Sequence, residues 1–427
     1  MTMSGNNYPK RRDRRTRVSP KTPKYTRWLI TVAALIWAAA GWFIATHFMD
    51  GPSNAKPAEE QKQLTLEEQA DRIVASMTAK EKVGQMVMAG IHGTQINGDS
   101  RYLIETYHFG GVCLFDRNMQ SREQVKELIS DLQSFAKKKQ TGSLPLFVAV
   151  DEEGGLVSRM KDKLPPPKSE EALGATGEPV NAEKSAKKIG KELKDMGFNI
   201  NFAPVADVGS GDGRSFSKDP EVVTKFVNAA GKGYRDAGIL YTLKHFPGIG
   251  RGKVDSHNDG SKINAGKETL MQTDMRPFQS MIQSSYANTK GDNSSLPGAA
   301  VPAPFFIMVS HLTYPSLDAE NPASLSSNVQ TDILRGQLGW KGIIVTDDLE
   351  MGAVSKHYSF RELGVRAVQA GADIVLICHE YEHAEAVADG LNEAVENGTI
   401  SEERLNESVK RIVMAKLYYL QNAEKGM

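Results

Sequence analysis

The sequence predicts an α/β fold, a (β/α)₈ TIM-type barrel, from three observations. Eight short apolar runs recur along the chain, and longer amphipathic stretches separate them. The runs lack a clean alternation of apolar and polar residues, which is typical of parallel strands buried on both faces. Charged residues and histidines stand where most of the runs end. The runs cover residues 85–91, 110–115, 146–151, 200–208, 241–246, 305–311, 342–348 and 372–379.

The stretches between the runs have the spacing of amphipathic helices, as in residues 122–139 and 182–197. Alternating strands and helices predict a parallel sheet, and eight such units over about 350 residues fit a barrel with insertions. A doubly wound open sheet is the alternative, but no Gly-x-Gly-x-x-Gly pattern follows an early strand. The Gly/Ser/Pro-rich connection 283–304 is long, and we expect a flexible surface insertion there rather than a substrate lid.

The folded domain is predicted to span residues 65–421. "TLEE" at 65–68 and "TAKE" at 78–81 both match the capping box that begins a helix. Residues 50–64 are rich in Pro, small and charged residues, and this composition predicts a linker.

The N-terminus has the pattern of a membrane anchor. Residues 1–27 carry nine Lys or Arg against one Asp, and residues 28–49 contain no charged side chain. About 20 apolar residues are enough for a helix to cross the hydrocarbon layer. By the positive-inside rule the basic tail stays in the cytoplasm. We therefore expect a single-pass signal anchor that places the domain outside the cell membrane. A cleaved signal peptide is the rival, but its apolar region is usually shorter.

Charge and cysteine content exclude several classes of protein. The net charge of the chain is zero, so the +8 of residues 1–27 leaves −8 for the remainder, which argues against a nucleic-acid partner. The two cysteines, Cys113 and Cys378, lie in apolar runs, where buried free thiols are expected. No disulfide framework or Cys-rich metal signature is present.

In a barrel of this type, catalytic residues gather at the C-terminal ends of the strands. The predicted strand ends carry many carboxylates and imidazoles, which indicates a polar cleft. These residues are Asp151-Glu152, Asp207, Lys244-His245, His311, Asp347-Asp348 and His379.

Two groups have the properties that glycosidic bond cleavage requires, namely a nucleophile and a proton donor. Asp347, at the tip of an apolar strand, suits the nucleophile, although an Asp there could also cap the next helix. In "DSH", Asp255 would favour the protonated form of His257, which could then act as the acid. The alternative is a turn with local hydrogen bonds.

The segment "KHFPGIGRGKVDSH" at 244–257 resembles the "KHFPGHGxxxxDSH" signature of the β-N-acetylglucosaminidases of glycoside hydrolase family 3. Further segments resemble that family in the same order, and together they cover residues 65–420. These segments are "VDEEGGLVSRM" at 150–160, "FAPVADV" at 202–208, "GRSFSKDP" at 213–220 and "IIVTDDLEMGAV" at 343–354.

The resemblance implies a role for each matching residue. Asp347 takes the place of the nucleophile, His257 that of the general acid/base, and Asp255 that of its carboxylate partner. Five further residues match those that bind the sugar's hydroxyl and acetamido groups. These are Asp151, Arg159, Arg214, Lys244 and His245. The resemblance also implies retention of anomeric configuration through a covalent glycosyl-enzyme intermediate, with no metal and no organic cofactor.

Two features of the loop depart from the family pattern. Ile249 replaces a His between two glycines, and we expect altered loop packing rather than lost activity. Arg251 and Lys253 add positive charge, and as a hypothesis they contact an anionic part of the aglycone, such as a lactyl group, a peptide carboxylate or a phosphate. Two solvated loop charges are the equally simple alternative.

These observations predict a membrane-anchored exo-β-N-acetylglucosaminidase that faces the cell wall. Its partner would be an N-acetylglucosamine-containing wall glycan or muropeptide, and we expect a monomer. A β-glucosidase or a broader exo-glycosidase of the same family is the alternative enzyme, and a non-catalytic protein that binds cell-wall glycan is the alternative from another class. A metal hydrolase built from Asp151, His245, His257 and His311 is a third alternative, although a close-spaced ligand motif is missing.

Overall fold

The computed structural model describes residues 64–161, 165–252, 261–288 and 301–421, together with isolated positions between 28 and 42. The chain divides into two units, residues 1–63 and 64–427. No helix among the described residues combines the length and the apolar character needed to cross a membrane. Most of the predicted anchor, 28–49, lies outside the described residues, as does the linker up to residue 63.

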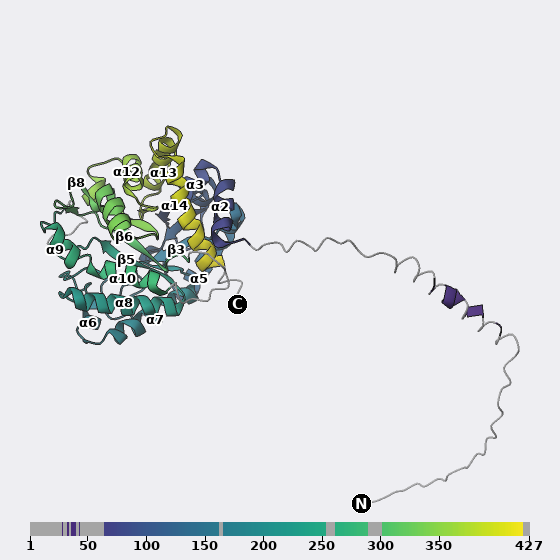
Figure 1. Ribbon diagram of the computed structural model, residues 1–427, viewed down its shortest axis with the longest axis horizontal. Helices are drawn as coiled ribbons and strands as arrows, with labels where there is room; N and C mark the ends of the chain where they lie inside the picture. The colour runs from purple at the N-terminus through teal and green to yellow at the C-terminus, as the bar shows by residue number, and fades with distance from the viewer. Residues whose placement is uncertain are drawn as a thin grey trace, which may run out of the picture. The chain divides into compact units, whose positions relative to one another are not determined.

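The centre of the second unit is a closed barrel of eight parallel strands, with helices around it (Figure 1). The order around the barrel is β1-β10-β9-β6-β5-β4-β3-β2, and pairs such as Val87 with Val375 close the ring. Each of the eight predicted runs overlaps one barrel strand, so the predicted barrel is confirmed. The strands are β1 (Val87–Gly90), β2 (Gly111–Cys113), β3 (Phe147–Val150), β4 (Ile200–Asn201), β5 (Leu240–Phe246), β6 (Phe305–Val309), β9 (Ile344–Asp348) and β10 (Ile374–Ile377).

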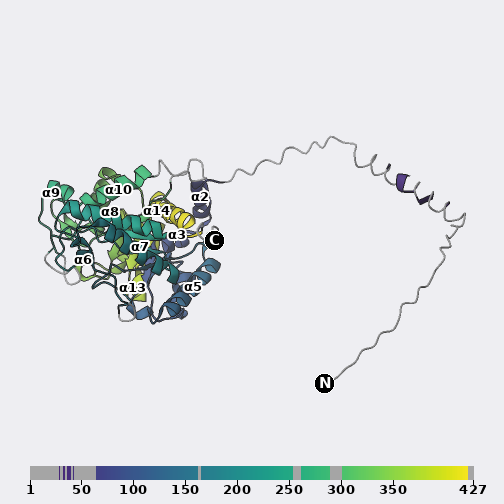
Figure 2. The ribbon, with the colours of Figure 1, turned by 90° about the horizontal axis from the view of Figure 1, so that it is seen from below.

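Helices follow the strands, and Figure 2 shows α7, α8 and α10 side by side along one flank of the barrel. The predicted capping boxes are present at Thr65 and Thr78, where each hydroxyl accepts the N–H of the Glu three residues later. The α-helices are α2 (Leu66–Ser76), α3 (Ala79–Gln85), α4 (Gly98–Thr106), α5 (Arg122–Lys139), α6 (Glu170–Gly174), α7 (Pro179–Met196), α8 (Pro220–Ala237), α9 (Lys267–Gln272), α10 (Arg276–Asn288), α11 (Gly352–Ser355), α12 (Phe360–Ala370), α13 (Tyr381–Glu396) and α14 (Glu402–Ala415).

Several short elements among the described residues lie outside the simple alternation of strand and helix. An antiparallel hairpin, β7 (Thr313–Tyr314) with β8 (Asp318–Pro322), follows β6. Two π-helical segments are present, η4 (Asn328–Gln337) before β9 and η5 (Lys416–Gln421) after α14. The sequence pattern did not predict the hairpin.

The predicted strand 200–208 is wrong in its length, because β4 ends at Asn201. Pro204 has no N–H to give to a sheet ladder, so regular pairing cannot continue through this segment. The chain runs on without strand pairing, apart from a single bridge between Val205 and Lys244. Asp207 therefore lies on a loop after β4 rather than at the tip of a strand.

One residue of the barrel strands differs from the others in its burial. The strands of the barrel are buried throughout, except that Asp347 on β9 is only partly buried. A carboxylate on a rigid strand is thus exposed at the mouth of the barrel, while its strand neighbours pack inside.

Candidate active site

A cavity of about 470 Å³ lies at the C-terminal ends of the barrel strands. All six predicted site residues within the described chain line it: Asp151, Arg159, Arg214, Lys244, His245 and Asp347. Further lining residues are Phe115, Glu153, Leu156, Val157, Phe202, Ile249, Met308, Asp348, Glu350, Met351, Gly352, Leu376, Cys378 and His379.

Lys244 on β5 is the central cation of this cavity. Its Nζ lies 2.6 Å from Asp151 Oδ1 and 2.6 Å from Glu153 Oε1, and the side chain is almost fully buried. Burial would raise the pKa of both carboxyls, but Lys244 and a second cation at each lower it. The net pKa of Asp151 lies far below its usual value, and that of Glu153 falls to about 2. The three groups therefore stay charged at neutral pH.

Arg159 returns to the cavity on a tight turn after β3. Its guanidinium donates to Asp151 Oδ2 at 3.0 Å, and its backbone N–H donates to Glu152 Oε2 at 3.0 Å. Gly154 and Gly155 have φ of 95° and 60°, a left-handed conformation that favours glycine and lets the chain reverse. Of the two carboxylates predicted at this strand end, Asp151 lines the cavity and Glu152 holds the turn from the other side.

Arg214, on the loop after β4, is fixed by a bidentate contact with Glu153. Its Nε and one terminal nitrogen donate to the two carboxylate oxygens at 2.8 and 2.9 Å. This geometry is among the strongest hydrogen-bonded ion pairs in proteins. The same terminal nitrogen lies 3.4 Å from Nε2 of His245. Arg214 thereby connects the acidic turn after β3 to the imidazole on β5.

His245 follows Lys244 directly on β5, and the peptide bond between them is cis. Both side chains line the cavity. Nδ1 of His245 lies 2.8 Å from Oδ2 of the buried Asp207. Asp207 Oδ1 accepts the backbone N–H groups of His245 at 3.1 Å and of Ile249 at 2.9 Å.

Asp347, the predicted nucleophile, projects from the end of β9 into the cavity. Its Oδ1 accepts the N–H of Asp348 at 2.9 Å. The described residues give Oδ2 no hydrogen-bond partner, so this oxygen is available to a bound substrate. Asp347 therefore has an oriented carboxylate on a rigid strand.

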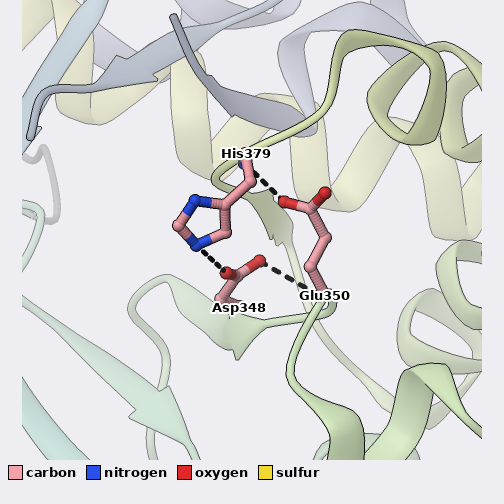
Figure 3. Close-up of side chains that lie close together, drawn as sticks. All are labelled: Asp348, Glu350 and His379. Atoms are coloured by element: carbon pink, nitrogen blue, oxygen red, sulfur yellow. Dashed lines mark hydrogen bonds and ion pairs between the residues drawn. The ribbon is translucent and has the colours of Figure 1, made fainter. Parts of the chain in front are cut away.

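Beside Asp347 lies the group of three residues drawn in Figure 3, Asp348, Glu350 and His379. Asp348 Oδ2 lies 3.3 Å from Nε2 of His379, and Glu350 accepts the backbone N–H of His379. The second ring nitrogen of His379 points away from both carboxylates (Figure 3). The hydrogen bond to Asp348 raises the pKa of His379, and burial opposes it.

Comparison with known proteins shows the family of this chain. Residues 78–289 and 298–415 match the model of the glycosyl hydrolase family 3 N terminal domain. The chain belongs to glycoside hydrolase family 3. The β-hexosaminidase LpqI of Mycobacterium tuberculosis (strain ATCC 25618 / H37Rv) is 31% identical over 413 residues, which are 92% of this chain and 97% of LpqI.

Two further relatives are longer than this chain. Beta-hexosaminidase A of Pseudoalteromonas piscicida is 34% identical over 342 residues, 74% of this chain but only 54% of the relative. The solved family 3 β-N-acetylglucosaminidase from Paenibacillus sp. str. FPU-7 is 38% identical with a TM-score of 0.74, over 81% of this chain and 64% of that one. The chain thus spans little more than half of the first relative's length and slightly less than two thirds of the second's.

Two residues of the family 3 signature, Asp255 and His257, lie outside the described residues, as does Lys253 of the same loop. Their predicted roles, including the acid/base role of His257, stay predictions.

Arg251 is not among the described residues that line the cavity. Its Nε donates to the buried Asp274 at 2.8 and 3.0 Å, and a terminal nitrogen donates to Thr273 at 2.9 Å. The hypothesis that Arg251 contacts an anionic aglycone stays a prediction.

His311 is a structural residue in this family 3 domain. It is buried, its Nδ1 lies 2.7 Å from the Ser324 hydroxyl, and its Nε2 donates to the Asp348 carbonyl at 2.8 Å. It does not line the cavity. A metal site that includes His311 with Asp151 and His245 does not match this arrangement.

Among the described residues, one group has ligand atoms close enough to hold a metal ion, namely Asp348, Glu350 and His379. The carboxylates already have protein partners, since Asp348 Oδ1 accepts two backbone N–H groups and Glu350 accepts those of His379 and Glu380. Nδ1 of His383 also contacts Glu350, at 2.6 Å from Oε1. This cluster shapes the loop after β10.

Sequence reasoning missed Glu153, which holds both Lys244 and Arg214. It stands in the quoted motif, two residues after Asp151. The turn places Asp151 and Glu153 on the cavity side and Glu152 on the other, the alternation that extended residues show. This alternation with a period of two residues could have identified Glu153 as a cavity residue.

Proposed function

We propose that this family 3 enzyme is a retaining exo-β-N-acetylglucosaminidase that releases terminal N-acetylglucosamine from peptidoglycan fragments or related wall glycans. One observation carries the proposal. Six side chains from the ends of four strands converge on a single cavity, and five of them are donors or acceptors suited to sugar hydroxyls while the sixth is Asp347. The relatives named β-hexosaminidase and β-N-acetylglucosaminidase support the choice of sugar.

The cavity suits one sugar residue. Small-ligand sites in proteins have volumes of about 300–1,000 Å³, and this one has about 470 Å³. Lys244 and Arg214 are held by carboxylates, so they need not reorganise when a substrate binds. Preorganised donors of this kind stabilise a transition state without a further cost of orientation.

In the first chemical step, Asp347 attacks the anomeric carbon. A bond forms between the anomeric carbon and a carboxylate oxygen, and the glycosidic C–O bond breaks. His257, charged by its partner Asp255, gives a proton to the departing oxygen. The products of this step are the free aglycone and a covalent glycosyl-enzyme.

In the second step, neutral His257 takes a proton from water as the water oxygen attacks the anomeric carbon. The bond to Asp347 breaks, and its carboxylate is regenerated. Two inversions at the anomeric carbon give net retention of configuration.

The decisive experiment is turnover of an aryl β-N-acetylglucosaminide by the full chain. Asp347→Asn should abolish turnover, whereas His257→Ala should lose less with an activated aryl leaving group than with a sugar leaving group. The first product, observed by NMR before mutarotation, should be the β-anomer. Faster hydrolysis of the aryl β-glucoside would favour the alternative enzyme, and tight glycan binding without turnover would favour a non-catalytic protein.

The wall assignment also depends on the N-terminal segment. We propose that residues 28–49 anchor the enzyme in the cell membrane with the domain outside, on the basis of the basic tail and the apolar run. Fractionation of cells should recover the full chain with membranes, and external protease should cleave it in intact protoplasts. Recovery in the medium would indicate cleavage instead.

A further inference from the structure

We propose that Asp207 is a positioning residue that fixes the tautomer of His245. In this tautomer Nδ1 carries the proton, and Nε2 presents a lone pair to a donating hydroxyl of the bound sugar. The inference rests on the proposed function for its sugar ligand, but the tautomer itself can be measured without any substrate.

The contacts of Asp207 determine which nitrogen is protonated. Its carboxylate is 1% exposed, and it receives three N–H groups: those of the His245 and Ile249 backbone at Oδ1 and that of the His245 ring at Oδ2. An ionised carboxylate can only accept hydrogen bonds, so Nδ1, at 2.8 Å, must be the donor. Three N–H donors at one carboxylate favour its ionised form.

The contact on the other side of the ring favours a lone pair on Nε2. Nε2 of His245 lies 3.4 Å from a terminal nitrogen of Arg214. A guanidinium can only donate, so a proton on Nε2 would place two donors face to face. The bidentate contact with Glu153 holds Arg214 in this orientation. In the proposed tautomer the lone pair of Nε2 therefore faces a donor and the cavity.

This tautomer places an acceptor, Nε2 of His245, directly beside a donor, the guanidinium of Arg214. A hydroxyl oxygen between Arg214 and Nε2 can accept from the first and donate to the second. The pair therefore recognises a hydroxyl by both of its hydrogen-bonding functions, which an ether or a deoxy position cannot satisfy.

The same protein contains a histidine with the opposite tautomer. Nε2 of His311 faces the backbone carbonyl of Asp348, which can only accept, so Nε2 carries the proton and Nδ1 accepts from Ser324. Both histidines are nearly buried. His311 is thus an internal reference for a measurement on His245.

The first test is an ¹⁵N NMR spectrum of the full chain with ring-labelled histidine, assigned with His245→Gln and His311→Gln variants. At pH 7, His245 should show a protonated-type Nδ1 and an unprotonated-type Nε2, and His311 the reverse. In the Asp207→Asn variant, His245 should show the His311 pattern, with an unprotonated Nδ1 and a protonated Nε2. The amide oxygen of the new side chain would accept the two backbone N–H groups, and its NH₂ group would then face Nδ1. An unprotonated Nδ1, or protons on both nitrogens, in the wild-type enzyme would overturn the proposal.

The second test is kinetic. Asp207→Asn should lower kcat/KM for an aryl N-acetylglucosaminide roughly 10- to 100-fold, as expected when a hydrogen bond to a buried polar group is mismatched. Against a series of monodeoxy substrates, the loss should disappear for the one that lacks the recognised hydroxyl. An equal loss on every substrate would show a structural role only and would overturn the proposal.

Asp274→Asn is the matched control for that variant. Asp274 is also buried and also accepts a hydrogen bond from a loop residue, Arg251, but it does not line the cavity. Thermal unfolding of both variants shows whether each is folded. Asp274→Asn should leave the His245 spectrum and the deoxy series unchanged, and a change equal to that of Asp207→Asn would contradict the specific role. Absence of turnover by the wild-type enzyme would instead contradict the proposed function, with the tautomer still measurable.

Discussion

Among single residues, Lys244 shows most clearly how the buried charges of the cavity depend on one another. It compensates two buried carboxylates, Asp151 and Glu153, at 2.6 Å each. Burial lowers the pKa of Lys244, but the two carboxylates raise it more, so the net pKa lies above its usual value. The removal of this ammonium would leave two anions close together in a site with little water.

We expect Lys244→Met to destabilise the fold by about 3–5 kcal/mol, the range for removing one partner of a buried ion pair. Activity should fall by at least about tenfold, because Asp151 and Glu153 would take up protons and the cavity would lose a donor that is predicted to bind the sugar. Urea unfolding and steady-state kinetics measure both effects. Lys232→Met, which breaks only the solvent-exposed ion pairs with Glu183 and Asp236, is the control and should change neither.

A second lysine is buried without any carboxylate. Lys416 donates to Gln85 Oε1 at 2.7 Å and to the Gly110 carbonyl at 2.8 Å, near the N-terminal ends of β1 and β2. Burial lowers its pKa to about 7. Since the unfolded chain keeps a value of about 10.4, the unfolded state binds more protons between these two pH values.

The free energy of unfolding should therefore rise with pH between about 7 and 10.4, by about 1.4 kcal/mol per pH unit from this group. Below pH 7 the destabilisation caused by burying Lys416 is constant, because Lys416 is protonated in both the folded and the unfolded state. In Lys416→Met this slope should be absent, while KM stays unchanged because the residue lies far from the mouth of the barrel. An unchanged slope in the variant, measured by denaturant unfolding from pH 6 to 10, would refute the assignment.

At the scale of elements, the loop after β5 depends on close backbone approach. A Cβ added to Gly250 would lie 2.0 Å from the Val208 carbonyl oxygen, which is fixed backbone of the loop after β4. Gly248 has φ of 126°, which favours glycine as well. The two glycines of "PGIG" thus allow this loop to pack against the segment that carries Asp207.

Gly250→Ala should separate these two loops and lower kcat/KM, because Ile249 would lose its hydrogen bond to Asp207. Gly266→Ala is the control, since nothing lies within 4 Å of a Cβ at that position. Kinetics on an aryl N-acetylglucosaminide should show a loss of roughly tenfold or more for the first variant, about the 1.4 kcal/mol of one hydrogen bond, and no loss for the second. Equal activity of both would show that the loop adapts.

At the scale of the whole molecule, one buried carboxylate connects several layers of the barrel. Asp373, which directly precedes β10, contacts Arg335 of η4 at 2.6 Å and Arg411 of α14 at 2.9 Å. It also accepts the N–H of Ile344, the first residue of β9, and the hydroxyl of Ser408. Burial alone would raise its pKa, but the arginines lower it.

Asp373→Ala should cost about 3–5 kcal/mol of stability, because it leaves the arginines without their shared anion. The stabilisation by the Asp373 carboxylate is fully present above about pH 4, the usual pKa of an Asp in the unfolded chain. It is lost as the pH falls through the lower pKa of Asp373 in the folded state. The control Asp389→Ala removes an exposed ion pair with Arg361 and should cost at most about 1 kcal/mol. Chemical unfolding at pH 7 and pH 3 compares the two.

The sequence by itself determined the barrel, its helix starts and the family, because burial on both faces, capping boxes and motif order are properties of short segments. It also indicated most of the residues that face the cavity, since catalytic residues in a barrel follow its strands. Only the tertiary structure decided which charges pair. Lys244 and Asp151 are 93 residues apart, and His245 and Asp207 are 38 apart. Such partners meet only when the strands and their loops assemble, so no local pattern could show that Glu153 holds Arg214, that Arg251 turns toward Asp274, or that Asp207 orients His245.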